Sequence, residues 1–234
     1  MLTDVTIVAR SDASIYTESV GGFAVRRTGP SRIHLISTAA TPLGGDEIRV
    51  RVVVEAGAVL RLHSVAATIA LPAAHRADSV ARWVIEVEEG GDLVCAPEPT
   101  IVAGGAHHTT TTRAHLHPDS RIVVAEHVQI GRGTLDAGAE GRWSGSLRVD
   151  AGDHPVLRHR LVLGPEETGR GHRGLTSTFT YPDDRPDVVS AKEYAARLCL
   201  AEVPGPSERV RTPTLTTVLA DGVSAARQVT AALG

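Results

Sequence analysis

Histidines spaced two residues apart are the first group in this sequence that could do chemistry. His115 and His117 would share one face of a β-strand, so both could reach a single metal ion, and imidazole nitrogen is a common ligand for zinc and nickel. The same face carries Arg113, which indicates contact with solvent. The pair is therefore a weak candidate for a metal site, with an ordinary polar strand face as the alternative.

Glu126 is the more informative residue because of its neighbours. In the segment "RIVVAEHVQI" it falls on the face that an alternating strand would give to the apolar residues Ile122, Val124, Val128 and Ile130. A carboxylate on an apolar face costs several kcal/mol (about 2 or more) unless it is paired, hydrogen-bonded or in contact with internal water. We therefore expect either a functional carboxylate beside a wet cavity or a structural salt bridge, with Arg132 as the candidate partner.

Two further acidic residues occupy positions that fix their direction. Glu98 in "CAPEPTI" lies between two prolines, which hold the backbone extended and remove two amide donors. It is either presented for function or an exposed residue at a rim. Asp46 in "TPLGGDEI" follows two glycines and precedes a strong strand pattern, so a hydrogen bond within a turn is its ordinary role.

The elements that must position these residues are short β-strands. Ile48, Val50, Val52 and Val54 alternate with Arg49 and Arg51, which predicts a half-buried strand. A strand, turn, strand pattern then recurs as "RVVVEAGAVLRLHS" from Arg51, "VIEVEEGGDLVCAP" from Val84, "RAHLHPDSRIVVAE" from Arg113 and "LRVDAGDHPVLRHR" from Leu147. We interpret these as β-hairpins stacked in a layered or β-helical arrangement, with an ordinary β-sandwich as the alternative.

The C-terminal third has a different character. A Gly-rich charged loop starts near Leu163, and the segments 187–201 and 221–233 have helical composition, with Asp221 as a plausible N-cap of the second. We therefore predict one mainly β domain over residues 1–234. It has a β-rich part at 1–165 and a loop and helical part at 166–234 with about two helices.

Composition excludes several classes of function. A formal net charge of -3 gives no basic field for nucleic acid, and no stretch reads as a secretory signal or membrane span. Two cysteines, Cys95 and Cys199, favour a reducing cytoplasmic setting over a disulfide framework. The sequence also lacks the common nucleophile, phosphate-binding and zinc-protease motifs, which argues modestly against an enzyme.

The order of motifs resembles one family. The series "TAATPLGGDEIRVRVVVEAGAVLRLHSVAAT", "LVCAPEPTIVAGGAHHTTTTRAHL" and "RIVVAEHVQIGR" is similar to urease accessory protein UreD, also called UreH, over about Thr38 to Leu163. The resemblance implies a non-enzymatic β-helical scaffold. It would join a UreF-like scaffold and a UreG-like GTPase on the urease apoprotein and support nickel insertion into the urease active site. An internal passage is the route proposed for the nickel ion in that family.

The resemblance also assigns residues. Asp46, Thr68, Glu126 and Arg132 match the family pattern, and Glu98 occupies a slot that often holds glutamine or another polar residue. These residues are thereby implied in nickel passage or complex formation, with no tightly bound cofactor and only transient nickel. The sequence departs from the pattern after its Ala-Ala-Thr motif, where "IALPAAHR" replaces a basic and aromatic pair, and at Ala125, where an aromatic residue is usual.

Two other classes of function stay open at this point. A free-standing metal-binding or storage protein would use the histidines of both pairs, His107, His108, His115 and His117. A carbohydrate-active β-helix enzyme would use Glu98 and Glu126 as an acid and base pair.

Overall fold

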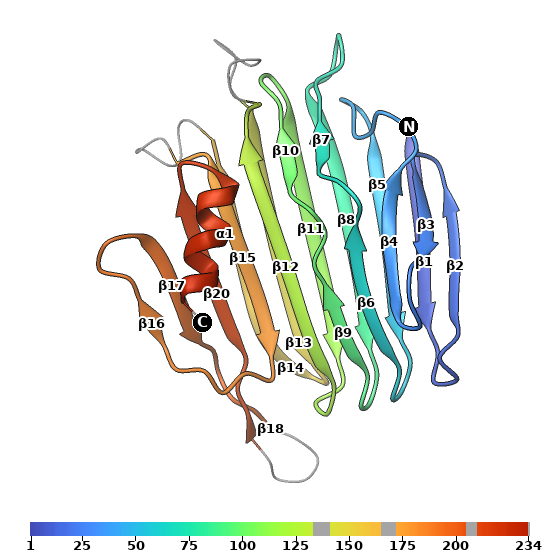
Figure 1. Cartoon of the computed structure of the whole chain (residues 1–234), viewed down its shortest axis with the longest axis vertical. Coiled ribbons are helices and arrows are strands. Elements are labelled where there is room, and N and C mark those ends of the chain that lie inside the picture. The colour runs from blue at the N-terminus through green and yellow to red at the C-terminus, as the bar shows by residue number, and fades with distance from the viewer. Residues whose placement is uncertain (133–140, 165–171, 205–209, 234) are drawn as a thin grey trace.

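The structure is a computed structural model, and it describes residues 1–132, 141–164, 172–204 and 210–233. Two large β-sheets face each other, and α1, the one helix in the described part of the chain, lies on the outer side of one of them (Figure 1). The mainly β, β-helical class is confirmed, as a solenoid of about three turns. None of the helices in the described ranges has the length and apolar character needed to cross a membrane.

The first sheet, sheet A, has seven strands. Its central strands β5, β8, β11 and β13 pair in parallel, residue against residue, and antiparallel strands close both ends. In spatial order the strands are β14 (His154–Leu163), β13 (Arg142–Ala151), β11 (His107–Leu116), β8 (Asp78–Val87), β5 (Glu47–Val54), β1 (Leu2–Ala9) and β2 (Ile15–Val20).

The second sheet, sheet B, has eleven strands, and a separate two-strand ribbon pairs β18 (Val203–Pro204) with β19 (Val210–Arg211). The main path of sheet B runs through β16 (Val188–Val189), β17 (Tyr194–Cys199), β20 (Thr214–Ala220), β15 (Gly174–Tyr181), β12 (Arg121–Ile130), β9 (Asp92–Cys95), β6 (Val59–Ser64), β4 (Arg32–Ser37) and β3 (Phe23–Arg27). Two short strands, β7 (Thr68–Ala70) and β10 (Thr100–Val102), follow β6 and β9 after a few unpaired residues. β7 pairs with β10, and β10 pairs with β12.

The hairpin interpretation is wrong for the first three repeats and right for the fourth. The turns at Gly57, Gly91 and Pro118 carry the chain from sheet A to sheet B, so β5 and β6 pair with strands of neighbouring coils and not with each other. At Gly152, by contrast, β13 and β14 pair antiparallel as a true hairpin. A turn between sheets and a hairpin show the same alternation of apolar and polar residues. The alternation indicates which face of a strand is buried, but it does not indicate which strand it pairs with.

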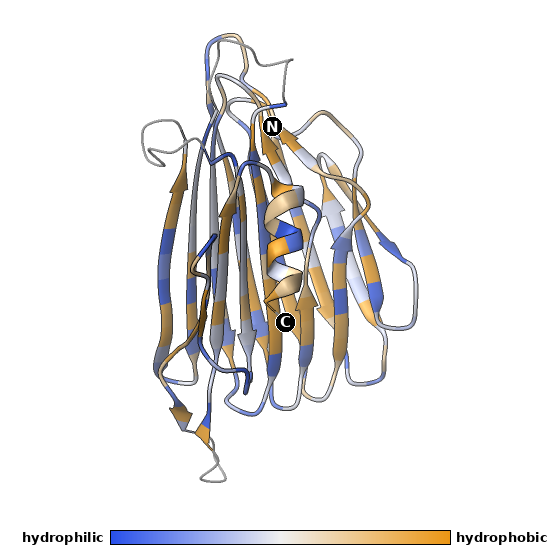
Figure 2. Ribbon diagram, turned by 60° about the vertical axis from the view of Figure 1, so that its left-hand side comes forward, coloured by the Kyte–Doolittle hydropathy of each residue, from blue (hydrophilic) through white to orange (hydrophobic). Residues whose placement is uncertain are grey.

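The core lies between the two sheets and consists mainly of aliphatic side chains. Val50, Val52 and Val54 of β5 face Leu60 and Leu62 of β6, and all five are almost fully buried. Hydrophobic and hydrophilic positions alternate along the strands (Figure 2), so each strand gives one face to the core. Burying each such aliphatic side chain contributes about 1.5–3 kcal/mol.

One of the two predicted helices is present. Helix α1 spans Val223–Ala232, but its N-cap is Gly222 and not Asp221. The side-chain oxygen of Gln129 accepts the amide hydrogen of Val223 at 2.8 Å, so strand β12 supplies the missing cap.

The helix predicted over 187–201 is wrong, since β16 and β17 occupy that region. Alternate residues Ala195 and Arg197 are buried while β17 pairs with β20, so sheet pairing overrides the local helix propensity. The charged loop predicted after Leu163 falls largely on residues 165–171, which lie outside the described residues.

Candidate functional site

A break in sheet B creates the most distinctive site of the molecule. Strand β12 pairs with β9 through residues 121–124 and with β10 through residues 128–130. Residues 125–127 face the gap between these pairings, where residues 96–99 join β9 to β10. Pro97 and Pro99 within this connection have no amide hydrogen to donate, which explains why the ladder is interrupted there.

A cavity of about 90 Å³ reaches this break from the space between the sheets. Its inner wall includes Trp83, Thr112 and Trp143 of sheet A. Its lining also includes Glu126 and His127, which are adjacent on β12 and therefore point to opposite faces of sheet B. Side chains on both faces of sheet B therefore line the cavity, and α1 packs on the outer face of this sheet against β12, β15 and β20 (Figure 1).

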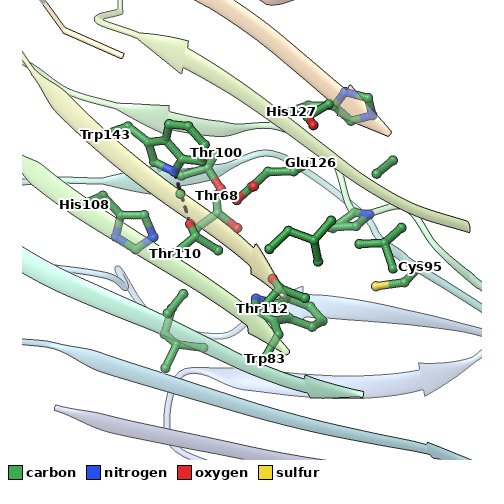
Figure 3. Close-up of a pocket in the computed structure, with 18 of the residues that line it drawn as sticks. Thr68, Trp83, Cys95, Thr100, His108, Thr110, Thr112, Glu126, His127 and Trp143 are labelled. Carbon is green, nitrogen blue, oxygen red and sulfur yellow. Dashed lines mark hydrogen bonds between the residues drawn. The ribbon is translucent and has the colours of Figure 1, made fainter. Parts of the chain in front are cut away.

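Glu126 supplies the carboxylate of the cavity, on the apolar face where the sequence places it. It points toward hydroxyl groups of neighbouring strands (Figure 3), and it forms no ion pair with any described residue. Burial raises the pKa of Glu126 to about 7, and a hydrogen bond with the Thr110 hydroxyl offsets part of that rise. The salt bridge to Arg132 expected as an alternative is not formed; Arg132 is exposed just beyond the end of β12.

Sheet A holds Thr110 in place opposite Glu126. The indole nitrogen of Trp143 donates to Thr110 Oγ1 at 3.1 Å, which leaves the hydroxyl hydrogen of Thr110 for the carboxyl group. Gly145 makes room for both partners. A Cβ at that position would lie 2.1 Å from Cζ2 of Trp143 and 3.1 Å from Oε2 of Glu126.

Further hydroxyl groups line the same cavity. Thr68, Thr100 and Ser177 contribute from sheet B, and Thr110 and Thr112 contribute from sheet A. Thr68 and Thr100 are paired across β7 and β10, directly beyond the break. The structure therefore brings Thr68, a residue singled out by the sequence, to the same cavity as Glu126.

Glu98 lies at the outer mouth of the cavity. Its Oε2 accepts a hydrogen bond from Nη1 of Arg227 in α1 at 3.0 Å, and both side chains remain partly exposed. The Glu98 backbone amide donates to Ser64 Oγ at 2.9 Å, so the proline-flanked segment is anchored to the neighbouring coil. The sequence correctly predicts a fixed direction for Glu98, but the partner Arg227 is distant in sequence and could not be predicted.

Three imidazoles line the cavity at separate places. Burial lowers the pKa of His108 to about 4, and its Nδ1 lies 2.9 Å from Ser79 Oγ. Burial also lowers the pKa of His127 to about 4, aided by the Arg227 cation and opposed by Glu98. The pKa of His159 is lowered by burial as well. All three are therefore neutral near pH 7, but they come from three different strands.

The remaining sequence candidates lie elsewhere. Asp46 accepts hydrogen bonds from the Met1 amino group, from Thr41 Oγ1 at 3.0 Å and from the Leu43 amide at 2.9 Å. Burial opposes ionisation of Asp46, but these bonds together lower its pKa. This is the turn role that its sequence context predicts, with an added ion pair to the amino group.

His115 and His117 occupy the outer face of sheet A, away from the cavity. His115 is exposed, and Nδ1 of His117 accepts the Asp119 amide at 3.1 Å within the turn to β12. His107 is also exposed, and His108 is buried on the opposite face of the strand. Within the described ranges, no three histidine, cysteine, aspartate or glutamate side chains converge on a position suited to a metal ion.

Thr110, Trp143 and Gly145 are among the cavity residues that were not singled out from the sequence, and His108 was considered only as a metal ligand, although a signal for burial was present for each of the four. His108 and Thr110 share their strand face with Ala114 and Leu116, which are buried apolar residues. Trp143 and Gly145 alternate with exposed or half-exposed polar residues in "RWSGS". The same period-two rule that picked out Glu126 would have placed these side chains inside.

Fold and site together define a class of protein: a stiff β-solenoid with an internal polar cavity whose donor groups are kept apart. Comparison with known proteins gives the family. Residues 17–231 match the model of the UreD urease accessory protein family. The chain therefore belongs to the UreD family.

Named relatives agree with this assignment. The chain is 34% identical over 219 residues to urease accessory protein UreD 1 of Saccharopolyspora erythraea, an alignment that covers 91% of this chain and 82% of that protein. It is 37% identical over 171 residues to UreD of Streptomyces avermitilis, covering 68% and 66% of the two chains. It is 38% identical over 150 residues to UreD of Frankia alni, where the alignment covers 58% of this chain and half (50%) of the relative.

Proposed function

We propose that this chain is a non-enzymatic, cytoplasmic scaffold in urease maturation, which binds the urease apoprotein together with a UreF-like scaffold and a UreG-like GTPase. In this role it supports insertion of nickel into the urease active site. Membership of the UreD family supports the place of the chain in urease maturation. The cavity around Glu126 is the observation that supports a part in handling the ion.

The spacing of donor groups in the cavity suits passage better than storage. One carboxylate, several hydroxyls and separated imidazoles can each contact a cation, but they do not form a closed cage. Nickel binds clustered nitrogen and thiolate ligands tightly, so such a cage would oppose its release to urease. Burial raises the pKa of the Cys95 thiol in the cavity wall to about 12, so this group is not a thiolate ligand at neutral pH.

Glu126 would act by changing its protonation state. With its pKa at about 7, the carboxyl group is partly protonated at neutral pH and hydrogen-bonded to Thr110. A divalent cation entering the cavity favours the ionised form and displaces the proton, because metal ligands must be deprotonated. When the cation leaves, the carboxyl group takes up a proton again, so a buried bare charge is not left behind.

The test uses a Glu126→Gln variant co-expressed with the urease structural and accessory proteins at limiting nickel. Glutamine keeps the volume of the side chain and removes only its ionisation. We expect the variant to fold and to be recovered with its partners in a pull-down, while the purified urease contains little nickel and has little activity. The matched control is Glu202→Gln, which changes an exposed glutamate between β17 and β18.

Each outcome of this test has a clear meaning. Normal nickel content and activity with Glu126→Gln would overturn the role of Glu126 while leaving the scaffold role in place. If deletion of the whole chain left activation unchanged, the scaffold role itself would be wrong. The pull-down separates a failure of assembly from a failure of nickel delivery.

A further inference from the structure

The outer face of sheet A carries two rows of arginines that the cavity does not use. Strand register places Arg51, Val84, Arg113, Arg148 and Arg158 side by side on β5, β8, β11, β13 and β14. The next row on the same face contains Arg49, Arg82, Thr111, Ser146 and Arg160. We call the seven arginines of these two rows the arginine face.

Like charges are placed next to one another within this face. Arg113, Arg148 and Arg158 occupy three successive strands at the same level, and neighbouring strands lie about 4.8 Å apart. Like charges directly opposite each other on a sheet are destabilising, and a guanidinium cannot lose its proton to relieve the repulsion. The arrangement therefore costs stability in the isolated chain and is relieved when anionic groups dock on it.

Carboxylates of this chain neutralise only part of the arginine face. Glu47 pairs with Arg49 at 2.9 Å and Arg82 at 3.1 Å, Glu86 pairs with Arg51 at 3.2 Å, and Asp150 pairs with Arg158. The other three arginines are exposed and have neither an ion pair nor a side-chain hydrogen bond with any described residue; they are Arg113, Arg148 and Arg160.

The arginine face borders an open groove. The groove, of about 630 Å³, lies beside Arg113, between β8, β11 and the turns at the end of sheet A, and its lining also includes the carboxylates of Glu86, Glu88, Glu89 and Asp150. Val84 in the floor of the groove is 42% exposed, so an apolar contact is available among the charges. The described helix lies on sheet B, so it does not cover the arginine face (Figure 1).

We propose that the arginine face is a docking surface for a partner protein that presents a row of carboxylates. The planar fork of arginine matches a carboxylate in a two-bond geometry. Glu47, Glu86 and Asp150 lie among the arginines and would repel the continuous phosphates of a nucleic acid, whereas a protein surface can offer both signs of charge. The inference is independent of the cavity and of nickel.

The experiment measures binding of a short labelled peptide with glutamate at alternate positions to the purified chain, by fluorescence anisotropy at low and physiological salt. A peptide with glutamine at the same positions and a short DNA duplex are the comparison ligands. One variant removes the three arginines that pair with no carboxylate of the described residues: Arg113→Ser, Arg148→Ser and Arg160→Ser. The matched control removes three exposed arginines from sheet B: Arg26→Ser, Arg32→Ser and Arg121→Ser.

We expect the glutamate peptide to bind the wild-type chain, to weaken with salt, and to lose about tenfold in affinity in the sheet A variant but not in the control. The melting temperature of the sheet A variant should equal or exceed that of the wild type, because like charges have been removed. If the triple change prevents folding, the single change Arg148→Glu gives the same readout.

Three results would overturn the proposal. They are equal binding of the glutamate and glutamine peptides, an equal loss of affinity in the sheet B control, and tighter binding of the DNA duplex than of the glutamate peptide. The last result would indicate a nucleic acid as the occupant of this face.

Discussion

Asp183 is buried just beyond β15 of sheet B, and Glu126 is half-buried in the cavity on the neighbouring strand β12. The two carboxyl groups differ in how many hydrogen-bond donors they receive. Asp183 follows β15 and accepts hydrogen bonds from the Arg185 guanidinium, the Arg185 amide and the Thr214 hydroxyl. Burial alone would raise its pKa, but these bonds hold the pKa of Asp183 at about 2. Burial raises the pKa of Glu126 to about 7, because only the Thr110 hydroxyl opposes it.

The number of hydrogen bonds that a carboxyl group accepts decides whether its pKa is lowered or raised in this fold. Asp183 accepts several and is a structural carboxylate, whereas Glu126 accepts few and can change its protonation state near neutral pH. Asp183 has a lowered pKa, so it stabilises the fold above its ordinary pKa, and that stability is lost as pH falls through about 2. Glu126 has a raised pKa, so its contribution is fully present below its ordinary pKa of about 4.3 and is lost as pH rises through about 7. The four changes below test this contrast and its limits.

The largest effect is expected from Asp183→Asn. Asparagine cannot satisfy both the Arg185 guanidinium and the Thr214 hydroxyl as a charged acceptor, so we expect a loss of about 2–3 kcal/mol in the free energy of unfolding near neutral pH. Urea unfolding at pH 7 measures it. Asp184→Asn, at the exposed neighbouring position, is the control and should change stability by less than about 0.5 kcal/mol. An equal loss in both variants would mean that the Asp183 bonds are not the cause.

Glu126→Gln is expected to act in the opposite direction. Near pH 8 the wild-type carboxyl group is ionised in a buried position, so the variant should be more stable by about 1–2 kcal/mol. Near pH 5 both side chains are neutral, and the two proteins should have nearly the same free energy of unfolding. Urea unfolding at both pH values measures the difference. A variant that is less stable than the wild type at pH 8 would show that the carboxylate has partners that stabilise its charge.

Thr110→Val tests the hydroxyl group that hydrogen-bonds to the Glu126 carboxyl group. The change removes the hydroxyl that lowers the pKa of Glu126 and leaves the buried indole N–H of Trp143 without its acceptor. We expect a loss of about 1 kcal/mol in unfolding free energy and a further rise in the pKa of Glu126, measured by the pH dependence of stability. The control is Thr109→Val on the exposed face of the same strand, which should be nearly neutral. An unchanged pH profile would remove Thr110 from the site.

The sequence was sufficient for the wall of the solenoid and insufficient for the way its coils connect. Alternation in β5 and β12 correctly predicted which residues face the core, including Glu126. It could not distinguish a turn between sheets at Gly57 from a hairpin at Gly152, because the partner of each strand is set by chain segments about thirty residues away. The helix predicted over 187–201 failed for the same reason: its composition is helical, but β20 offers it a pairing edge.

The candidate site shows a similar division. A carboxylate on an apolar face and a glutamate between two prolines are local signals, and both lead to the cavity. The break in sheet B depends on the ends of β9 and β10 relative to β12, and the Glu98–Arg227 ion pair joins segments far apart in sequence. Such relations belong to the assembled fold and have no local pattern in the sequence.

The smallest effect is expected from the double change His115→Ala with His117→Ala, which tests whether imidazoles outside the cavity share its role. His115 is exposed on the outer face of sheet A, and the ring of His117 accepts the turn amide of Asp119, so neither side chain reaches the space around Glu126. Removing them should change stability by only a few tenths of a kcal/mol (about 0.5 or less) and leave urease activation within about twofold of the wild type. The measurement is urease activity after co-expression at limiting nickel, with a pull-down to confirm that the partners still assemble. His115 and His117 line the groove that borders the arginine face, so a loss of assembly would indicate that they contribute to partner docking. A loss of activation with assembly intact would instead place the nickel path at these two imidazoles and not at Glu126.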